Sequence, residues 1–103
     1  MPTERDDSTE ADEERVHAHV LVSGRVQGVA YRANTRETVK EYDIAGWVRN
    51  LDDGRVEAVF EGPRPHVEAV VEWCETGSPA ARVEDVEVEY SSPNGASGFR
   101  VRW

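Results

Sequence analysis

The sequence predicts an α+β fold of the split βαβ type, in which one antiparallel sheet of four or five strands carries two helices on one face. Three observations lead to this fold class. Hydrophobic periods of two and of about 3.6 residues follow one another in the order strand, helix, strand, strand, helix, strand. An Asp-Gly pair separates the two middle strand segments. A short alternating segment at the end of the sequence adds an edge strand.

The first strand and the first helix lie on either side of a turn that contains glycine. Apolar residues occupy every second position of the first strand, from Val16 to Val22, and they alternate with His17, His19 and Leu21. The helical pattern that follows runs from about Tyr31 to Tyr42, and the segment Asp43 to Gly46 ends it.

A hairpin forms the middle of the predicted fold. Its strands are Gly46 to Leu51 and Arg55 to Glu61, and the turn between them contains Asp52-Asp53-Gly54. We expect Gly62-Pro63 to break the second of these strands, because proline cannot donate a ladder hydrogen bond.

The second helix begins near Arg64, and Gly77-Ser78-Pro79 ends it. Its apolar stripe has helical spacing and consists of Val67, Val70, Val71 and Cys74. The fourth strand, Val83 to Tyr90, has an irregularity near Asp85, and a loop leads to the short last strand at Phe99 to Trp103. The complete order is that of a ferredoxin-like βαββαβ sandwich with an additional C-terminal edge strand.

The charge of the chain limits its partners. It has 21 acidic and 12 basic residues, a net charge of −9. Residues 1–14 form a predicted disordered acidic tail with a charge of −6, and residues 15–103 form the domain with −3. This balance argues against nucleic acid and anionic membranes as partners. Such acidic, lysine-poor composition is typical of proteins from a high-salt cytoplasm, although a GC-rich genome also replaces lysine with arginine.

The sequence predicts a cytoplasmic, soluble protein. Its single cysteine allows no internal disulfide, and no apolar run or signal-peptide pattern is present. A monomer is the default expectation.

The segment Gly24 to Ala33 predicts an anion-binding site. It joins the first strand to the first helix, so free backbone N–H groups at the helix N-terminus converge on one place. Gly24 and Gly28 permit the backbone angles that this requires, and Arg32 adds a forked cation. Neither the Walker pattern nor the dinucleotide fingerprint is present. The alternative is a plain tight connection with a solvated arginine.

Asn50 is the second candidate residue, at the end of the second strand. In a split βαβ fold, the end of this strand approaches the start of the first helix, so Asn50 and Arg32 are expected to face one small volume. The alternative is that Asn50 merely begins the turn that follows it.

Other polar and aromatic residues have simpler interpretations. His17 and His19 lack acidic or thiol ligands beside them in the sequence, so we expect solvated strand residues and no metal site. Cys74 is expected in the core. The three tryptophans are expected to pack, and the arginines near the predicted site either add positive potential or pair with carboxylates. These residues are Trp47, Trp73, Trp103, Arg25, Arg36 and Arg49.

The sequence resembles the acylphosphatase family from about Val16 to Trp103. The segments that carry the resemblance are Gly24-Arg25-Val26-Gln27-Gly28-Val29, Arg32, Gly46-Trp47-Val48-Arg49-Asn50, Asp53-Gly54-Arg55-Val56-Glu57, Gly77-Ser78-Pro79-Ala80-Ala81-Arg82-Val83 and Phe99-Arg100-Val101. Family members more often have Gly-Phe where this chain has Ala30-Tyr31, a departure that touches no side chain with an assigned role.

The resemblance implies hydrolysis of acyl phosphates to a carboxylate and inorganic phosphate, without a metal or another cofactor. It assigns phosphoryl binding to Arg32 and to the loop amides of Gln27, Gly28, Val29, Ala30, Tyr31 and Arg32, and it assigns orientation of the attacking water to Asn50. The expected partners are a small acyl phosphate as substrate and inorganic phosphate as a product inhibitor. The physiological acyl phosphate is not specified by the sequence.

Two other functions are compatible with the same fold. A non-catalytic module that binds an acyl or carbamoyl phosphate is the first, and the presence of both Arg32 and Asn50 argues against it. An RNA-binding domain is the second, but it requires a basic surface and aromatic residues on the central strands. The first strand has no aromatic residue, and the net charge is negative.

Overall fold

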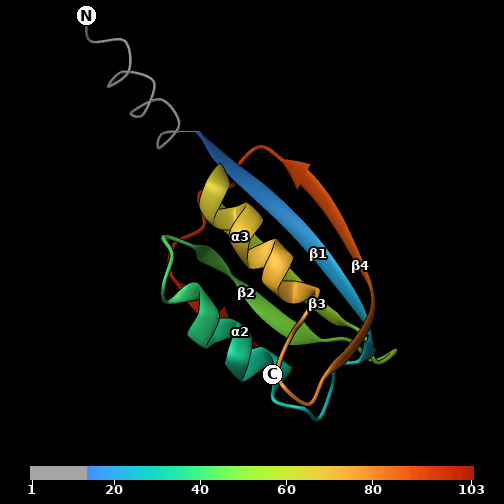
Figure 1. Ribbon diagram of the computed structural model, residues 1–103. Helices are drawn as coiled ribbons and strands as arrows, with labels where there is room; N and C mark the ends of the chain where they lie inside the picture. Colours follow the sequence, from blue (N-terminus) through green and yellow to red (C-terminus); the bar gives the residue numbers. More distant parts are fainter. Residues whose placement is uncertain (1–13) are drawn as a thin grey trace, which may run out of the picture.

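The computed structural model describes residues 14–103. Its strands and helices are β1 (Arg15–Arg25), α2 (Tyr31–Val39), β2 (Ala45–Asn50), β3 (Val56–Pro63), α3 (Arg64–Cys74), β4 (Arg82–Ser91) and β5 (Phe99–Val101). The sheet has the order β4-β1-β3-β2-β5, and both helices cover the same face (Figure 1). The ferredoxin-like α+β arrangement predicted from the sequence is confirmed.

The predicted acidic tail lies outside the described residues, except for Glu14. The backbone carbonyl of Glu14 accepts a hydrogen bond of 3.0 Å from the Arg64 amide, and its carboxylate lies 3.1 Å from Arg64 Nε. Neither helix in the described part of the chain is long and apolar enough to cross a membrane.

The core lies between the sheet and the two helices. The alternation predicted for β1 is confirmed, because its apolar positions are buried and pair with the inner positions of β3. The helices add their own buried stripes to this layer. The buried helical residues are Tyr31, Thr35 and Val39 in α2, and Val67, Val70 and Cys74 in α3. Burial raises the pKa of the Cys74 thiol to about 12, so the side chain stays a neutral core residue as predicted.

The sheet is mixed, whereas the sequence analysis predicted a fully antiparallel one. β5 pairs with β2 in parallel, with Val101 beside Val48. β4 ends beside the start of β1. The segment between β4 and β5 then crosses to the other edge of the sheet, where it arrives next to the start of β2. β5 therefore enters the sheet in the direction of β2.

Three boundaries refine the predicted elements. α2 ends at Val39, before the expected Tyr42, because the next amides bond three residues back in a tight turn. Gly62-Pro63 does not break β3, which continues to Pro63; as the last residue of the strand, Pro63 does not interrupt the ladder within it. The irregularity predicted near Asp85 is confirmed as a register shift opposite Ser23 and Gly24.

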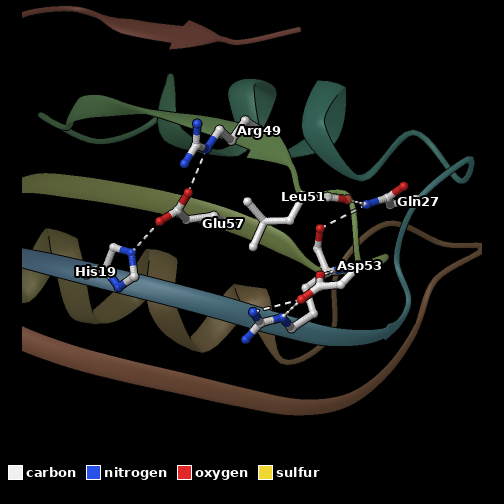
Figure 2. Close-up of polar contacts among 7 residues, drawn as sticks. His19, Gln27, Arg49, Leu51, Asp53 and Glu57 are labelled. Atoms are coloured by element: carbon white, nitrogen blue, oxygen red, sulfur yellow. Dashed lines mark hydrogen bonds and ion pairs between the residues drawn. The ribbon is translucent and has the colours of Figure 1, made fainter.

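The face of the sheet away from the helices carries polar side chains that pair with glutamates. His17 Nδ1 lies 2.5 Å from Glu61 Oε2, and His19 Nε2 lies 2.6 Å from Glu57 Oε2. Glu57 also accepts a hydrogen bond of 2.6 Å from Arg49 Nε (Figure 2). The prediction of solvated histidines is therefore wrong, because the antiparallel register of β1 and β3 brings a glutamate to each one.

Candidate active site

The loop between β1 and α2 has unusual backbone angles directly before the first amides of the helix. Gly28 has φ +76°, and Ala30, the residue before the helix, has φ +61° and ψ +28°. The first hydrogen bond within the helix joins the Asn34 amide to the Ala30 carbonyl at 3.0 Å. The amides that precede Asn34 have no carbonyl one turn back, so they point out of the helix end. This is the arrangement that favours an anion.

Buried hydrogen bonds hold the back of this loop. Ser78 Oγ donates to the Val29 carbonyl at 2.8 Å, and the Tyr31 hydroxyl donates to the Cys74 carbonyl at 2.7 Å. Burial raises the pKa of Tyr31 far above its usual value, so the hydroxyl keeps its proton and remains a donor. These bonds attach the loop and the first turn of α2 to α3 and the connection that follows it.

Gln27 connects the loop to the β2–β3 hairpin. Its Nε2 donates to the Leu51 carbonyl at 2.7 Å and to the Arg55 carbonyl at 2.9 Å. Figure 2 shows the Gln27 side chain directed toward Leu51, the residue after Asn50. The Leu51 amide also donates to the Arg55 carbonyl at 2.8 Å. The two ends of the turn are therefore bonded to each other, and the Gln27 side chain is bonded to both. The distance between the loop and Asn50 is therefore set by direct contacts.

Arg32 and Asn50 line one cavity of about 230 Å³. The lining residues are Val26, Gly28, Ala30, Tyr31, Arg32, Ala33, Asn50 and Trp103. Four of the six predicted loop residues are among them. Gln27 is turned toward the hairpin, and Val29 packs in the core. The expected proximity of α2 and the end of β2 is thus present in the structure.

The chain after β5 completes this cavity, which sequence reasoning missed. Arg32 Nη1 donates to the Arg102 carbonyl at 2.7 Å, and the Arg32 guanidinium carbon lies 4.1 Å from the centre of a Trp103 ring. Figure 1 shows the C-terminus beside the first turn of α2. Trp103 was expected to pack in the fold, yet it is 95% exposed.

The position of Trp103 depends on the parallel register of β5. Val101 pairs with Val48, so the residue two positions later is level with Asn50. A sequence pattern indicates a short alternating strand, but it contains no signal for this register.

Arg49, one of the arginines expected near the predicted site, does not line the cavity. Arg49 forms an ion pair with Glu57, as the alternative interpretation of this arginine proposed. Within residues 14–103, no group of three histidine, cysteine, aspartate or glutamate residues is arranged to hold a metal ion.

Comparison with known proteins identifies the family. A family model described as acylphosphatase matches residues 18–101. The chain belongs to the acylphosphatase family. The hydrolase class expected from the resemblance is confirmed by this membership, and the fold predicted from the residue patterns agrees with the solved structures of the family.

Individual relatives resemble the chain over most of its length. The acylphosphatase of Natronomonas pharaonis is 68% identical over 86% of this chain and 97% of that protein. The acylphosphatase of Haloarcula marismortui is 67% identical over 84% of this chain and 94% of that protein. The solved structure of an acylphosphatase from Coxiella burnetii has a TM-score of 0.83 and 40% identity, over 87% of this chain and 95% of that one.

Proposed function

We propose that this protein hydrolyses acyl phosphates in the cavity between the β1–α2 loop, Asn50 and Trp103. One observation carries the proposal. The end of a helix with outward-pointing amides, an arginine and a side-chain amide line the same small cavity. Phosphoryl transfer requires charge stabilisation and positioning. The helix amides and the arginine supply the first, and the side-chain amide supplies the second.

Arg32 and the loop amides bind the phosphoryl group in this proposal. A guanidinium has five N–H donors in a plane, and one of those of Arg32 is used by the Arg102 carbonyl. Other donors in the plane are suited to two phosphoryl oxygens. The amides at the helix end add neutral donors, which stabilise the charge on the oxygens without repelling the arginine.

Asn50 orients the attacking water. Its side-chain carbonyl accepts a hydrogen bond from the water and its NH₂ group donates, but an amide cannot take up a proton. The water oxygen bonds to phosphorus while the bond between phosphorus and the acyl oxygen breaks, and the electron pair leaves with the carboxylate. The proton of the water passes to a phosphoryl oxygen or to solvent.

The leaving group explains why so few residues suffice. A carboxylic acid has a pKa of roughly 4, so the carboxylate departs without a general acid. The site then needs only to place the water and stabilise the phosphoryl charge. Hydrolysis without a metal ion follows as a proposal from this chemistry. The cytoplasmic location and the monomeric state expected from the sequence remain predictions.

A non-catalytic binding module is the second candidate. Such a module needs Arg32 and the amides, but it has no use for a water-orienting amide. Asn50 lines the same cavity as Arg32, which favours the enzyme over the module.

The test is turnover of acetyl phosphate by the purified protein, with EDTA present and absent. We expect equal rates in the two conditions, and competitive inhibition by inorganic phosphate, because the product fits the same donors. Loss of activity in EDTA that a divalent ion restores contradicts the metal-free mechanism. Phosphate binding without any turnover supports the binding module instead.

A further inference from the structure

Trp103 is an exposed aromatic residue whose side chain does not contribute to the core. It is 95% exposed, while the other large exposed hydrophobic residue among residues 14–103, Tyr90, is 42% exposed. Its ring centre lies 4.1 Å from the guanidinium carbon of Arg32, and the residue lines the cavity. Large apolar side chains that are exposed at a binding cavity are typical of ligand contact.

The geometry of the stack leaves free the donors of Arg32 that do not bond to the Arg102 carbonyl. The N–H groups of a guanidinium point outward in its plane, and an aromatic ring over its face does not block them. A phosphoryl group bound by these donors therefore lies beside the edge of the stacked pair. The acyl carbon of an acyl phosphate is only two bonds from phosphorus, so the acyl group lies next to the ring of Trp103.

The lining of the cavity divides into a polar and an apolar part. Arg32, Asn50 and the loop amides are polar, whereas Val26, Ala33 and the ring of Trp103 are apolar. The phosphoryl group takes the polar part. The apolar part is left for the acyl group.

We propose that Trp103 is a specificity-determining residue that packs against the acyl group, and that it selects acyl phosphates with aromatic or other apolar acyl groups over acetyl phosphate. This inference rests on the proposed function. An acyl group that covers the ring removes apolar surface from water and adds the energy of an aromatic pair. The contact exists in both the bound substrate and the transition state, so it lowers KM more than it raises kcat.

The test compares the kcat/KM of benzoyl phosphate with that of acetyl phosphate in the wild type, Trp103→Ala and Trp103→Phe. The ratio of the two values isolates the acyl contact, because any disturbance of Arg32 affects both substrates. Tyr90→Ala is the matched control, since Tyr90 is also an exposed aromatic residue near an arginine, 5.8 Å from Arg64, and it does not line the cavity.

We expect Trp103→Ala to lower this ratio by roughly three- to tenfold, the range that aromatic pair energies correspond to. Trp103→Phe keeps most of the ratio, and Tyr90→Ala leaves it unchanged. The variants remain folded, which thermal melts verify, because the Trp103 side chain is almost fully exposed.

Three results overturn the inference. An unchanged ratio in Trp103→Ala means that the ring does not contact the acyl group. An equal loss for both substrates means that Trp103 only orients Arg32. A ratio in Trp103→Phe as low as in Trp103→Ala excludes an aromatic contact. Failure of the proposed function is distinct, because the wild type then hydrolyses neither substrate.

Discussion

Ala30 shows how one backbone angle shapes the site. Its φ of +61° places it in the left-handed region, where it is the one non-glycine residue with positive φ among residues 14–103. A side chain with a Cβ is less stable there by about 1–2 kcal/mol. Because Ala30 directly precedes α2, its conformation turns the chain from the loop into the helix. Family members more often have glycine where this chain has Ala30, so the departure adds backbone strain at this position, although no side chain with a proposed role changes.

We expect Ala30→Gly to stabilise the protein by up to about 1 kcal/mol, because glycine relieves the left-handed strain and the greater entropy of the unfolded chain offsets part of the gain. Ala33→Gly is the matched control. Ala33 lies in α2 with ordinary helical geometry, and glycine there lowers stability by about 0.5–1 kcal/mol. Urea unfolding measures both free energies. A destabilised Ala30→Gly, equal to Ala33→Gly, contradicts the left-handed conformation.

At the scale of elements, Gln27 joins the phosphate loop to the hairpin that carries Asn50. We expect Gln27→Ala to lower kcat by about tenfold, because small displacements of reacting groups have effects of this size or larger. The inhibition constant of phosphate changes by less than about threefold, because Arg32 and the loop amides remain.

Ser78→Ala is the control for this prediction. It removes the buried bond to the Val29 carbonyl, whose donor comes from the segment after α3 and not from the hairpin. A stability loss of about 1–2 kcal/mol is expected in both variants. A similar kcat loss in the two variants shows that general loosening of the loop, and not the link between loop and hairpin, is responsible.

Glu61 connects β3 with the segment that leads from β4 to β5. It is 2% exposed, and its carboxylate accepts hydrogen bonds from the Asn94 amide at 2.6 Å and the Ala96 amide at 2.9 Å. Burial opposes its ionised form, but the hydrogen bonds from His17 and these amides outweigh burial and lower its pKa. The group therefore stabilises the fold above the pKa of the unfolded chain, and this contribution is lost as pH falls through the folded pKa.

We expect Glu61→Gln to lower the free energy of unfolding by about 1–3 kcal/mol at neutral pH, because a buried donor loses its charged acceptor. The difference from the wild type shrinks as pH falls below the ordinary glutamate pKa of about 4.3 and through the lower folded pKa, because the wild-type carboxyl then becomes protonated. Denaturant unfolding across this pH range provides the measurement, with the exposed Glu89→Gln as control. A difference that is constant with pH contradicts the role of the charge.

Local sequence patterns predicted most of the strands and helices. The features that were not predicted depend on strand register, which these patterns do not specify. The alternation in β1 and the apolar stripe of α3 are read directly from residue spacing, and both are buried as predicted except for Val71, which is half-buried. The parallel pairing of β5 has no such signal, and the positions of Trp103 and the Arg102 carbonyl depend on it. The same limit explains His17, whose partner Glu61 is opposite only because of the β1–β3 register.

The charge of the whole molecule predicts its response to salt. The chain has a net charge of −9, and residues 1–13 contribute six acids and one arginine to it. Self-repulsion of this kind destabilises a compact state and is screened by salt, whose Debye length falls to about 3 Å at 1 M.

We expect the melting temperature to rise as KCl increases from low concentration to about 1 M, with the steepest rise at the low end, because screening saturates. Removal of residues 1–13 should make this dependence shallower, since it removes five of the nine net negative charges. Thermal melts followed by circular dichroism provide the comparison. A melting temperature that is flat or decreases with KCl rules out self-repulsion as a main determinant of stability.

The most direct test of the proposed site is to separate Arg32 from Asn50 in one set of kinetics. Arg32→Ala should weaken competitive inhibition by phosphate and abolish turnover of acetyl phosphate, and Arg32→Lys should rescue poorly because lysine lacks the planar fork. Asn50→Ala should lose kcat by roughly a hundredfold and bind phosphate nearly as well as the wild type. If Asn50→Ala keeps kcat and loses only phosphate affinity, Asn50 does not orient the water. Normal turnover in both variants places the active site elsewhere.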